Sequence, residues 1–288
     1  MVFQETYTLS NGVEIPRLGL GTWFIDNDSV AEAVKQAVTL GYRHIDTAQA
    51  YGNEAGIGVG VKNCGVPREA LFITSKVAAE HKSYESAAAS IDDSLQTMGL
   101  SYIDMMIIHS PQPWNEVNQS DNRYFEENRQ VWQALEDALA AGKVRAIGVS
   151  NFLQEDIDNL LETATVKPMV NQVLCHISNT PFALIDDCRD KGIAVEAYSP
   201  VAHGEAMKNP TIKEIADKYG VSVAQLCIRY DLQLGAIVIP KTAHPEHMRT
   251  NAELDFVISD EDMAMLKAVP KIKDYGEHSR FPVYGGKK

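Results

Sequence analysis

Short apolar runs alternate with amphipathic helical patterns along the whole chain. The runs are too short for helices and are typical of buried strands in a parallel sheet. No low-complexity stretch or flexible linker interrupts the alternation, so we expect one domain over residues 1–288. Eight strand–helix units predict an α/β fold, a closed (β/α)8 TIM barrel rather than an open sheet. The predicted strands lie at 18–20, 44–46, 71–74, 105–108, 144–149, 169–173, 194–198 and 236–239.

Helical periodicity and one turn signal complete the predicted topology. A Ser-Asn-Gly turn at residues 10–12 predicts an N-terminal β-hairpin over residues 6–15, which we expect to close the bottom of the barrel. Apolar residues recur at helical spacing between the strands. These patterns predict helices near 30–38, 54–62, 84–98, 131–139, 157–164, 182–190 and 212–234.

The charge of the chain limits its partners. The formal net charge is −13, which argues against binding to nucleic acid or to an anionic membrane. No apolar stretch approaches the ~20 residues of a membrane span. The four cysteines are scattered without a Cys-x-x-Cys pair, as in reduced cytoplasmic proteins. We therefore expect a cytoplasmic protein, and a monomer, because no exposed apolar stripe demands a partner.

Polar residues follow three consecutive predicted strands. Asp46 ends the second strand and Tyr51 lies in the loop beyond it. Lys76 comes two residues after the third strand, and His109 follows the fourth directly. Taken singly, such residues are often helix caps, solvated lysines or packed histidines. Because the carboxyl ends of barrel strands form one face, their coincidence at three neighbouring ends favours an active site.

These four residues fit the chemistry of carbonyl reduction. The developing alkoxide needs a proton, and a free tyrosine with a pKa of about 10 is a reluctant donor. We expect the Lys76 ammonium group to lower the pKa of Tyr51, and Asp46 to keep Lys76 charged. His109 can donate an N–H to the substrate oxygen. A nicotinamide cofactor would supply the hydride.

The chain resembles the aldo-keto reductase superfamily over essentially its whole length, and within it the microbial diketogluconate reductases. The resemblance implies reduction of aldehyde or ketone carbonyls of small molecules with NADP(H). It implies the same catalytic residues, Asp46, Tyr51, Lys76 and His109. The matching segments are GLGTW at 19–23, GYRHIDTA at 41–48, YGNE at 51–54, TSK at 74–76, IH at 108–109, GKVRAIGVSNF at 142–152, NQ at 171–172, AYSP at 197–200 and IPK at 239–241.

The resemblance also implies a cofactor site. Ser150, Asn151 and Gln172 would hold the nicotinamide carboxamide, and Tyr198 would stack on the ring. No Gly-x-Gly-x-x-Gly loop follows a strand, which argues against a Rossmann domain. The further cofactor contacts implied are Gly21, Thr22, Trp23, Asp46, Ser199, Pro200 and Val201.

The segment after the last strand bears on the choice of cofactor. Relatives hold the 2′-phosphate of NADP with a lysine, a hydroxyl residue and an arginine, and Lys241 and Thr242 match the first two. His247 stands at the arginine position, while Asn251 is retained. Because histidine is mostly neutral at pH 7, we expect NADP(H) with reduced discrimination and NAD(H) as an alternative cofactor. A shifted alignment would place Arg249 there instead.

Aromatic residues near the strand ends are candidate substrate contacts. They are Trp23, Phe24 and Trp114, together with Tyr51 and His109. The tail at residues 275–288 is rich in glycine and aromatic residues. It either folds over the mouth of the barrel or forms a disordered terminus.

Two other functions compete with reduction. A metal-dependent barrel hydrolase would use His44, Asp46, Lys76, His109 and His176, but it leaves Tyr51 unexplained and lacks convincing ligand spacing, so we expect no metal. Alternatively the barrel is catalytically silent and serves as a binding or regulatory module. The intact set of four reactive residues argues against that interpretation.

Overall fold

The computed structural model describes residues 2–117 and 119–285. Eight parallel strands form a sheet in the order β10-β9-β8-β7-β6-β5-β4-β3. Its edges meet, because the Val238 nitrogen donates to the Arg17 oxygen at 2.8 Å and the Gly21 nitrogen to the Pro240 oxygen at 3.0 Å. The result is a (β/α)8 TIM barrel, as predicted. The strands are β3 (Gly19–Gly21), β4 (His44–Asp46), β5 (Phe72–Val77), β6 (Ile103–Ile108), β7 (Val144–Ser150), β8 (Val170–Leu174), β9 (Ala194–Tyr198) and β10 (Ile237–Ile239).

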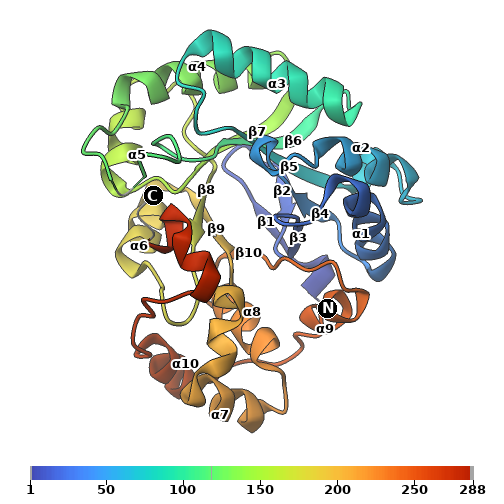
Figure 1. Ribbon diagram of the computed structural model, residues 1–288, viewed down its shortest axis with the longest axis vertical. Helices are drawn as coiled ribbons and strands as arrows, with labels where there is room; N and C mark the ends of the chain where they lie inside the picture. The colour runs from blue at the N-terminus through green and yellow to red at the C-terminus, as the bar shows by residue number, and fades with distance from the viewer. Residues whose placement is uncertain (1, 118, 286–288) are drawn as a thin grey trace.

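Helices surround the sheet and bury its outer face (Figure 1). Most helices pack their apolar stripes in one core with the strands, and helices near the C-terminus form a second apolar cluster. They are α1 (Asn27–Leu40), α2 (Glu54–Asn63), α3 (Tyr84–Met98), α4 (Phe125–Ala140), α5 (Gln154–Leu161), α6 (Phe182–Lys191), α7 (Pro210–Tyr219), α8 (Val223–Gln233), α9 (Pro245–Asn251) and α10 (Asp260–Lys267).

The predicted N-terminal hairpin is present. β1 (Thr6–Thr8) pairs antiparallel with β2 (Glu14–Pro16). The Asn11 side chain in its turn donates to the Arg145 backbone oxygen at 2.9 Å, near the start of β7. This contact places the hairpin at the amino ends of the barrel strands, opposite the face where barrel sites form.

The structure corrects two predicted elements. The pattern at 212–234 forms two helices, α7 and α8, because Gly220 ends the first helix with φ of +66°. The third strand extends to Val77, so Lys76 lies inside β5 rather than beyond it. Its side chain points into the barrel, where its Nζ reaches the Asp46 carboxylate.

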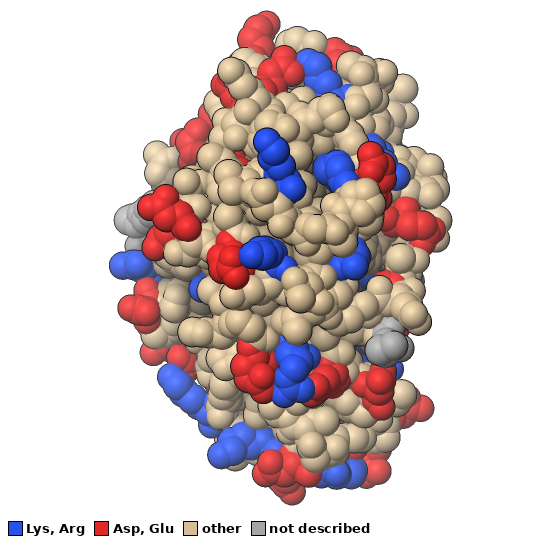
Figure 2. All heavy atoms as spheres, turned by 90° about the vertical axis from the view of Figure 1, so that its right-hand side faces the viewer, with Lys and Arg blue, Asp and Glu red and all other residues tan. Residues whose placement is uncertain are grey.

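The surface mixes the two signs of charge. Figure 2 shows acidic and basic side chains interspersed on the face that carries α1, α2 and α9. Within the described part of the chain, no helix combines the length and the apolar character that a bilayer crossing needs.

Candidate active site

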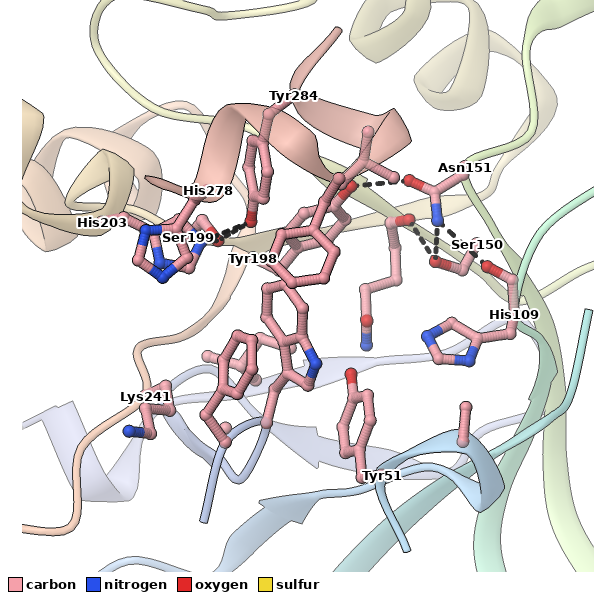
Figure 3. A pocket seen from close by; sticks show the side chains of 18 of the residues that line it. Tyr51, His109, Ser150, Asn151, Tyr198, Ser199, His203, Lys241, His278 and Tyr284 are labelled. Atoms are coloured by element: carbon pink, nitrogen blue, oxygen red, sulfur yellow. Dashed lines mark hydrogen bonds between the residues drawn. The ribbon is translucent and has the colours of Figure 1, made fainter. Parts of the chain in front are cut away.

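A pocket of about 720 Å³ opens at the carboxyl ends of the strands. Figure 3 shows Tyr51 and His109 on one side of it and Lys241 on the opposite side. Its walls carry most of the predicted site residues. Those that line it are Gly21, Trp23, Phe24, Asp46, Tyr51, His109, Trp114, Ser150, Asn151, Gln172, Tyr198, Ser199, Pro200, Val201 and Lys241.

Lys76 lies beneath the floor of this pocket and is fully buried. Its Nζ donates to both carboxylate oxygens of Asp46 and to the Thr47 backbone oxygen, each at 2.7 Å. The Tyr51 hydroxyl oxygen lies 3.3 Å from the same nitrogen. Parallel pairing of β4 with β5 brings the lysine and the aspartate together. The barrel thus holds a tyrosine hydroxyl against a buried ion pair.

The pKa of Tyr51 shifts in the direction opposite to the prediction. Burial raises it well above the ordinary value, and the carboxylates of Asp46 and Glu196 raise it further. Lys76 does contact the hydroxyl, but Asp46 already compensates its charge at shorter distance. Tyr51 is consequently a protonated phenol at neutral pH.

His109 completes the polar part of the floor. Its ring lies edge-on to the rings of Tyr51 and Trp114, with centroid distances of 5.6 and 4.9 Å. Burial and the Lys76 ammonium group hold its pKa well below the usual value. The imidazole is therefore neutral and carries a single N–H.

One wall consists of side chains that position each other. Ser150 donates to the Gln172 backbone oxygen at 2.9 Å, and Asn151 donates to the Ser150 hydroxyl at 3.1 Å. The Tyr198 hydroxyl donates to the Asn151 side-chain oxygen at 2.7 Å. Asn151 and the neighbouring Ser199 have positive φ angles of 59° and 55°. Such backbone strain outside glycine is typical of functional sites.

Four predicted cofactor residues lie outside the lining of the pocket. Thr22 is buried and donates to the Asp46 backbone oxygen at 2.8 Å. Thr242 accepts from the His244 backbone nitrogen at 3.0 Å, next to Lys241. His247 is exposed on α9, and Asn251 is buried on the same helix.

The alternative placement of Arg249 finds no support in its contacts. Its guanidinium group pairs with Glu246 at 2.6 Å and with Glu253. Residues two positions apart on a helix do not share a face, so Arg249 and His247 point in different directions. His247 packs edge-on to His244 at 5.3 Å.

The structure adds wall residues that the sequence did not single out. The tail folds over the pocket mouth, as one of the two predictions had it, while residues 286–288 lie outside the described residues. Tyr284 bonds Ser199 and His203 at 2.7 Å each, and the ring of His203 stacks on His278 at 3.8 Å (Figure 3). The aromatic tail was a usable signal, whereas nothing near His203 pointed to the pocket.

The residues of the metal-site alternative have other partners. His176 bonds the Tyr275 hydroxyl at 2.9 Å, and His44 bonds the Thr74 hydroxyl at 3.2 Å. Across residues 2–117 and 119–285, no group of three or more His, Cys, Asp or Glu side chains is arranged to hold a metal ion.

The fold and the site define a barrel oxidoreductase, with a protonated tyrosine, a buried lysine–aspartate pair and a neutral histidine at the strand ends. The aldo/keto reductase family model matches residues 17–271, and the chain belongs to this family. It is similar to glyoxal reductase of Bacillus subtilis, with 42% identity over 275 residues that cover 95% of each chain.

Two further comparisons agree. Morphine 6-dehydrogenase of Pseudomonas putida is 37% identical over 273 residues, covering 90% of this chain and 88% of that protein. A solved structure of a Bombyx mori aldo-keto reductase in complex with NADP has a TM-score of 0.85 at 32% identity. The structural match covers 97% of this chain and 98% of the Bombyx mori chain.

Proposed function

We propose that this protein is an NADP(H)-dependent carbonyl reductase that converts aldehydes and ketones of small molecules to alcohols. The observation that carries the proposal is the contact of the Tyr51 hydroxyl with Lys76, 3.3 Å away and itself paired with Asp46. Family membership, the NADP complex of a structural neighbour and the reductase and dehydrogenase relatives support it.

The pocket fits a nicotinamide dinucleotide. Its volume of about 720 Å³ lies within the range of about 300–1,000 Å³ usual for small-molecule and cofactor sites. Ser150, Asn151 and Gln172 offer polar groups for a carboxamide, and Tyr198 offers an aromatic face. When bound, the cofactor supplies the hydride. The protein supplies orientation, a proton and electrostatic stabilisation.

Tyr51 is the proton donor in this proposal. The proton leaves Tyr51 Oη for the carbonyl oxygen as that oxygen gains negative charge. The Lys76 ammonium group stabilises the phenolate left behind, and Asp46 holds the ammonium in place. His109, being neutral, donates its N–H to the same substrate oxygen and orients it. Trp23, Phe24 and Trp114 form apolar walls around the substrate.

The far end of the pocket bears on cofactor choice. Lys241 is exposed and makes no side-chain hydrogen bond or ion pair to another described residue, so its ammonium group is available to a 2′-phosphate. Thr242 follows Lys241 directly and His247 lies on α9, but neither lines the pocket, and a histidine lacks the permanent, bidentate charge of an arginine. We therefore propose NADP(H) as the main cofactor with measurable use of NAD(H).

The proposed enzyme is a single-domain, monomeric, cytoplasmic protein. A family model that extends over residues 17–271 supports one domain. The large exposed apolar side chains of the described residues come from separate elements, as Phe24, Val59 and Val257 do, and this supports a monomer. The cytoplasmic location stays a prediction from the sequence.

Replacing Tyr51 by Phe tests the proton donor. We expect turnover of a small aldehyde with NADPH to fall at least ~100-fold, because general acid catalysis contributes that much or more. NADPH affinity, followed by fluorescence titration, should change less than about twofold, since the variant lacks only one hydroxyl. Normal turnover in Tyr51→Phe would contradict the mechanism. Failure of the wild type to bind either nucleotide would favour the catalytically silent barrel.

A further inference from the structure

Glu196 has a buried carboxyl group inside the barrel to which the mechanism above gives no part. It lies in the middle of β9 and is 0% exposed. In the sheet it pairs with Gln172 on β8 and with Ile237 on β10. Isolated carboxylates are expensive to bury, and barrel interiors are usually filled by apolar side chains. We therefore expect Glu196 to have a function that offsets the free-energy cost of burying it.

The contacts of Glu196 lead directly to the pocket. The Gln172 side-chain nitrogen donates to Glu196 Oε2 at 2.6 Å and to Asp46 Oδ1 at 2.8 Å. A primary amide has two N–H groups, so both are in use. Gln172 Oε1 accepts no hydrogen bond from the described residues, and Gln172 lines the pocket. The amide oxygen is therefore free to accept from a ligand.

Two acceptors are needed to fix this amide. Asp46 is paired with the Lys76 ammonium group and accepts one N–H of Gln172. With that contact alone the terminal torsion of a glutamine side chain stays broad, because the amide can rotate about the single bond. The second acceptor, Glu196 Oε2, fixes the plane of the Gln172 amide and therefore the direction of Gln172 Oε1.

On its other side Glu196 lies against the lower barrel, where its Oε1 has no hydrogen-bond partner among the described residues. Its Oε1 lies 3.5 Å from His44 Nε2, and His44 also contacts Thr74 on β5. The imidazole fits because Gly19 on the neighbouring strand has no side chain. A Cβ at Gly19 would lie 2.7 Å from His44 Nδ1. Residues of β3, β4 and β5 thus enclose this end of the Glu196 side chain.

We propose that Glu196 is a positioning residue that fixes the Gln172 amide with its oxygen toward the pocket, where it accepts a hydrogen bond from the carboxamide NH2 of the nicotinamide. The inference rests on the proposed function, since it assigns a partner within that site. Glu196 acts through Gln172 and touches neither substrate nor cofactor.

The test compares three ligands on wild-type enzyme and on Glu196→Leu. The ligands are NADP⁺, its 3-acetylpyridine analogue, which replaces the carboxamide NH2 by a methyl group, and ADP-ribose 2′-phosphate, which lacks the nicotinamide. We expect the variant to bind NADP⁺ about tenfold more weakly, as for a lost buried hydrogen bond. Its preference for NADP⁺ over the acetylpyridine analogue should disappear. Its affinity for ADP-ribose 2′-phosphate should change less than about twofold, because that ligand does not reach Gln172.

Two further variants separate positioning from general damage. Glu196→Gln keeps an acceptor oxygen near Gln172 and should retain most of the preference for the carboxamide. Glu54→Gln changes another buried carboxylate, which is bonded to Ser75 and Ser94 rather than to Gln172, and should leave the preference unchanged. If Glu196→Leu does not fold, Glu196→Val, with a side chain suited to a strand, has the same expected result.

The outcomes distinguish the two proposals. Retention of the carboxamide preference in Glu196→Leu, or equal weakening of all three ligands, would overturn the role of Glu196. Loss of the preference in Glu54→Gln would overturn it as well. If wild-type enzyme binds none of the three ligands, the proposed function itself is wrong.

Discussion

The two lysines at the pocket, Lys76 and Lys241, occupy opposite environments. Lys76 is fully buried, and the oxygens of Asp46 and Thr47 compensate its charge. Lys241 is exposed, and no side-chain hydrogen bond or ion pair to another described residue engages it. The barrel thus fixes Lys76 at the floor of the pocket before any ligand binds. Lys241, at the outer end of the pocket, gains a partner only from a bound ligand. Substitutions at the floor should affect folding and chemistry together, and substitutions at the outer end should affect nucleotide choice alone.

The largest effect is expected for Lys76→Met. Removing one partner of a buried ion pair leaves the Asp46 carboxylate without its cation, which costs about 3–5 kcal/mol in unfolding free energy. Lys143→Met is the matched control, because Lys143 is 41% exposed and pairs with Asp92 at the surface. The control should lose less than about 1 kcal/mol. Urea denaturation of both variants measures the difference, and equal losses would contradict the contrast between buried and exposed lysines.

The buried floor should also make stability depend on pH through Glu196. Burial and the Asp46 carboxylate raise its pKa from 4.5 to about 8. The folded state therefore holds this proton more tightly than the unfolded state. The resulting stabilisation is complete below pH 4.5 and is lost as the pH rises through 8.

Glu196→Gln cannot titrate, so its stability relative to wild type should increase between pH 5 and 8. The slope is at most ~1.4 kcal/mol per pH unit. The groups that act on Glu196 are His44 and Asp46 from β4, Tyr51 from the segment after β4, Lys76 from β5 and Gln172 from β8. Burial holds the pKa of His44 near 3, so it stays neutral in this window. Urea denaturation across the pH range checks the slope. If the difference in unfolding free energy between Glu196→Gln and wild type does not change with pH, the raised pKa of Glu196 is contradicted.

At the outer end, Lys241→Met should change affinity without changing stability. Loss of a charge-assisted contact to the 2′-phosphate should weaken NADPH about tenfold or more, while NADH should change less than about twofold. Parallel fluorescence titrations provide the measurement. Equal weakening of the two nucleotides would refute the phosphate assignment of Lys241.

The smallest effect is expected for His247→Arg. A fixed, bidentate cation should raise the preference for NADPH over NADH by about threefold to tenfold. Arg249→Gln is the control. Because Arg249 is already paired with Glu246 and Glu253, its loss should leave the nucleotide preference unchanged. A larger effect at Arg249 than at His247 would place the phosphate on the other face of α9.

Sequence periodicity alone determined the barrel and the approximate positions of its strands. It also led to Asp46, Tyr51, Lys76 and His109, because residues at the ends of parallel strands meet on one face whatever the details of packing. The separation of His247 from Arg249 was open in the sequence. The structure adds that Arg249 is paired with Glu246 and Glu253, and which of the two residues meets the phosphate stays a prediction.

Only the tertiary structure decided how these residues act on one another. The contact of Gln172 with Asp46 spans 126 positions, and that of Tyr284 with His203 joins the tail to the segment after β9. Local patterns carry no information on such pairings, since they depend on barrel register and on the path of the tail. The direction of the Tyr51 pKa shift likewise follows from burial and from carboxylates on two strands. Periodicity therefore determines which residues stand at the strand ends, whereas packing determines which other segments reach the pocket and what charge and orientation the side chains have there.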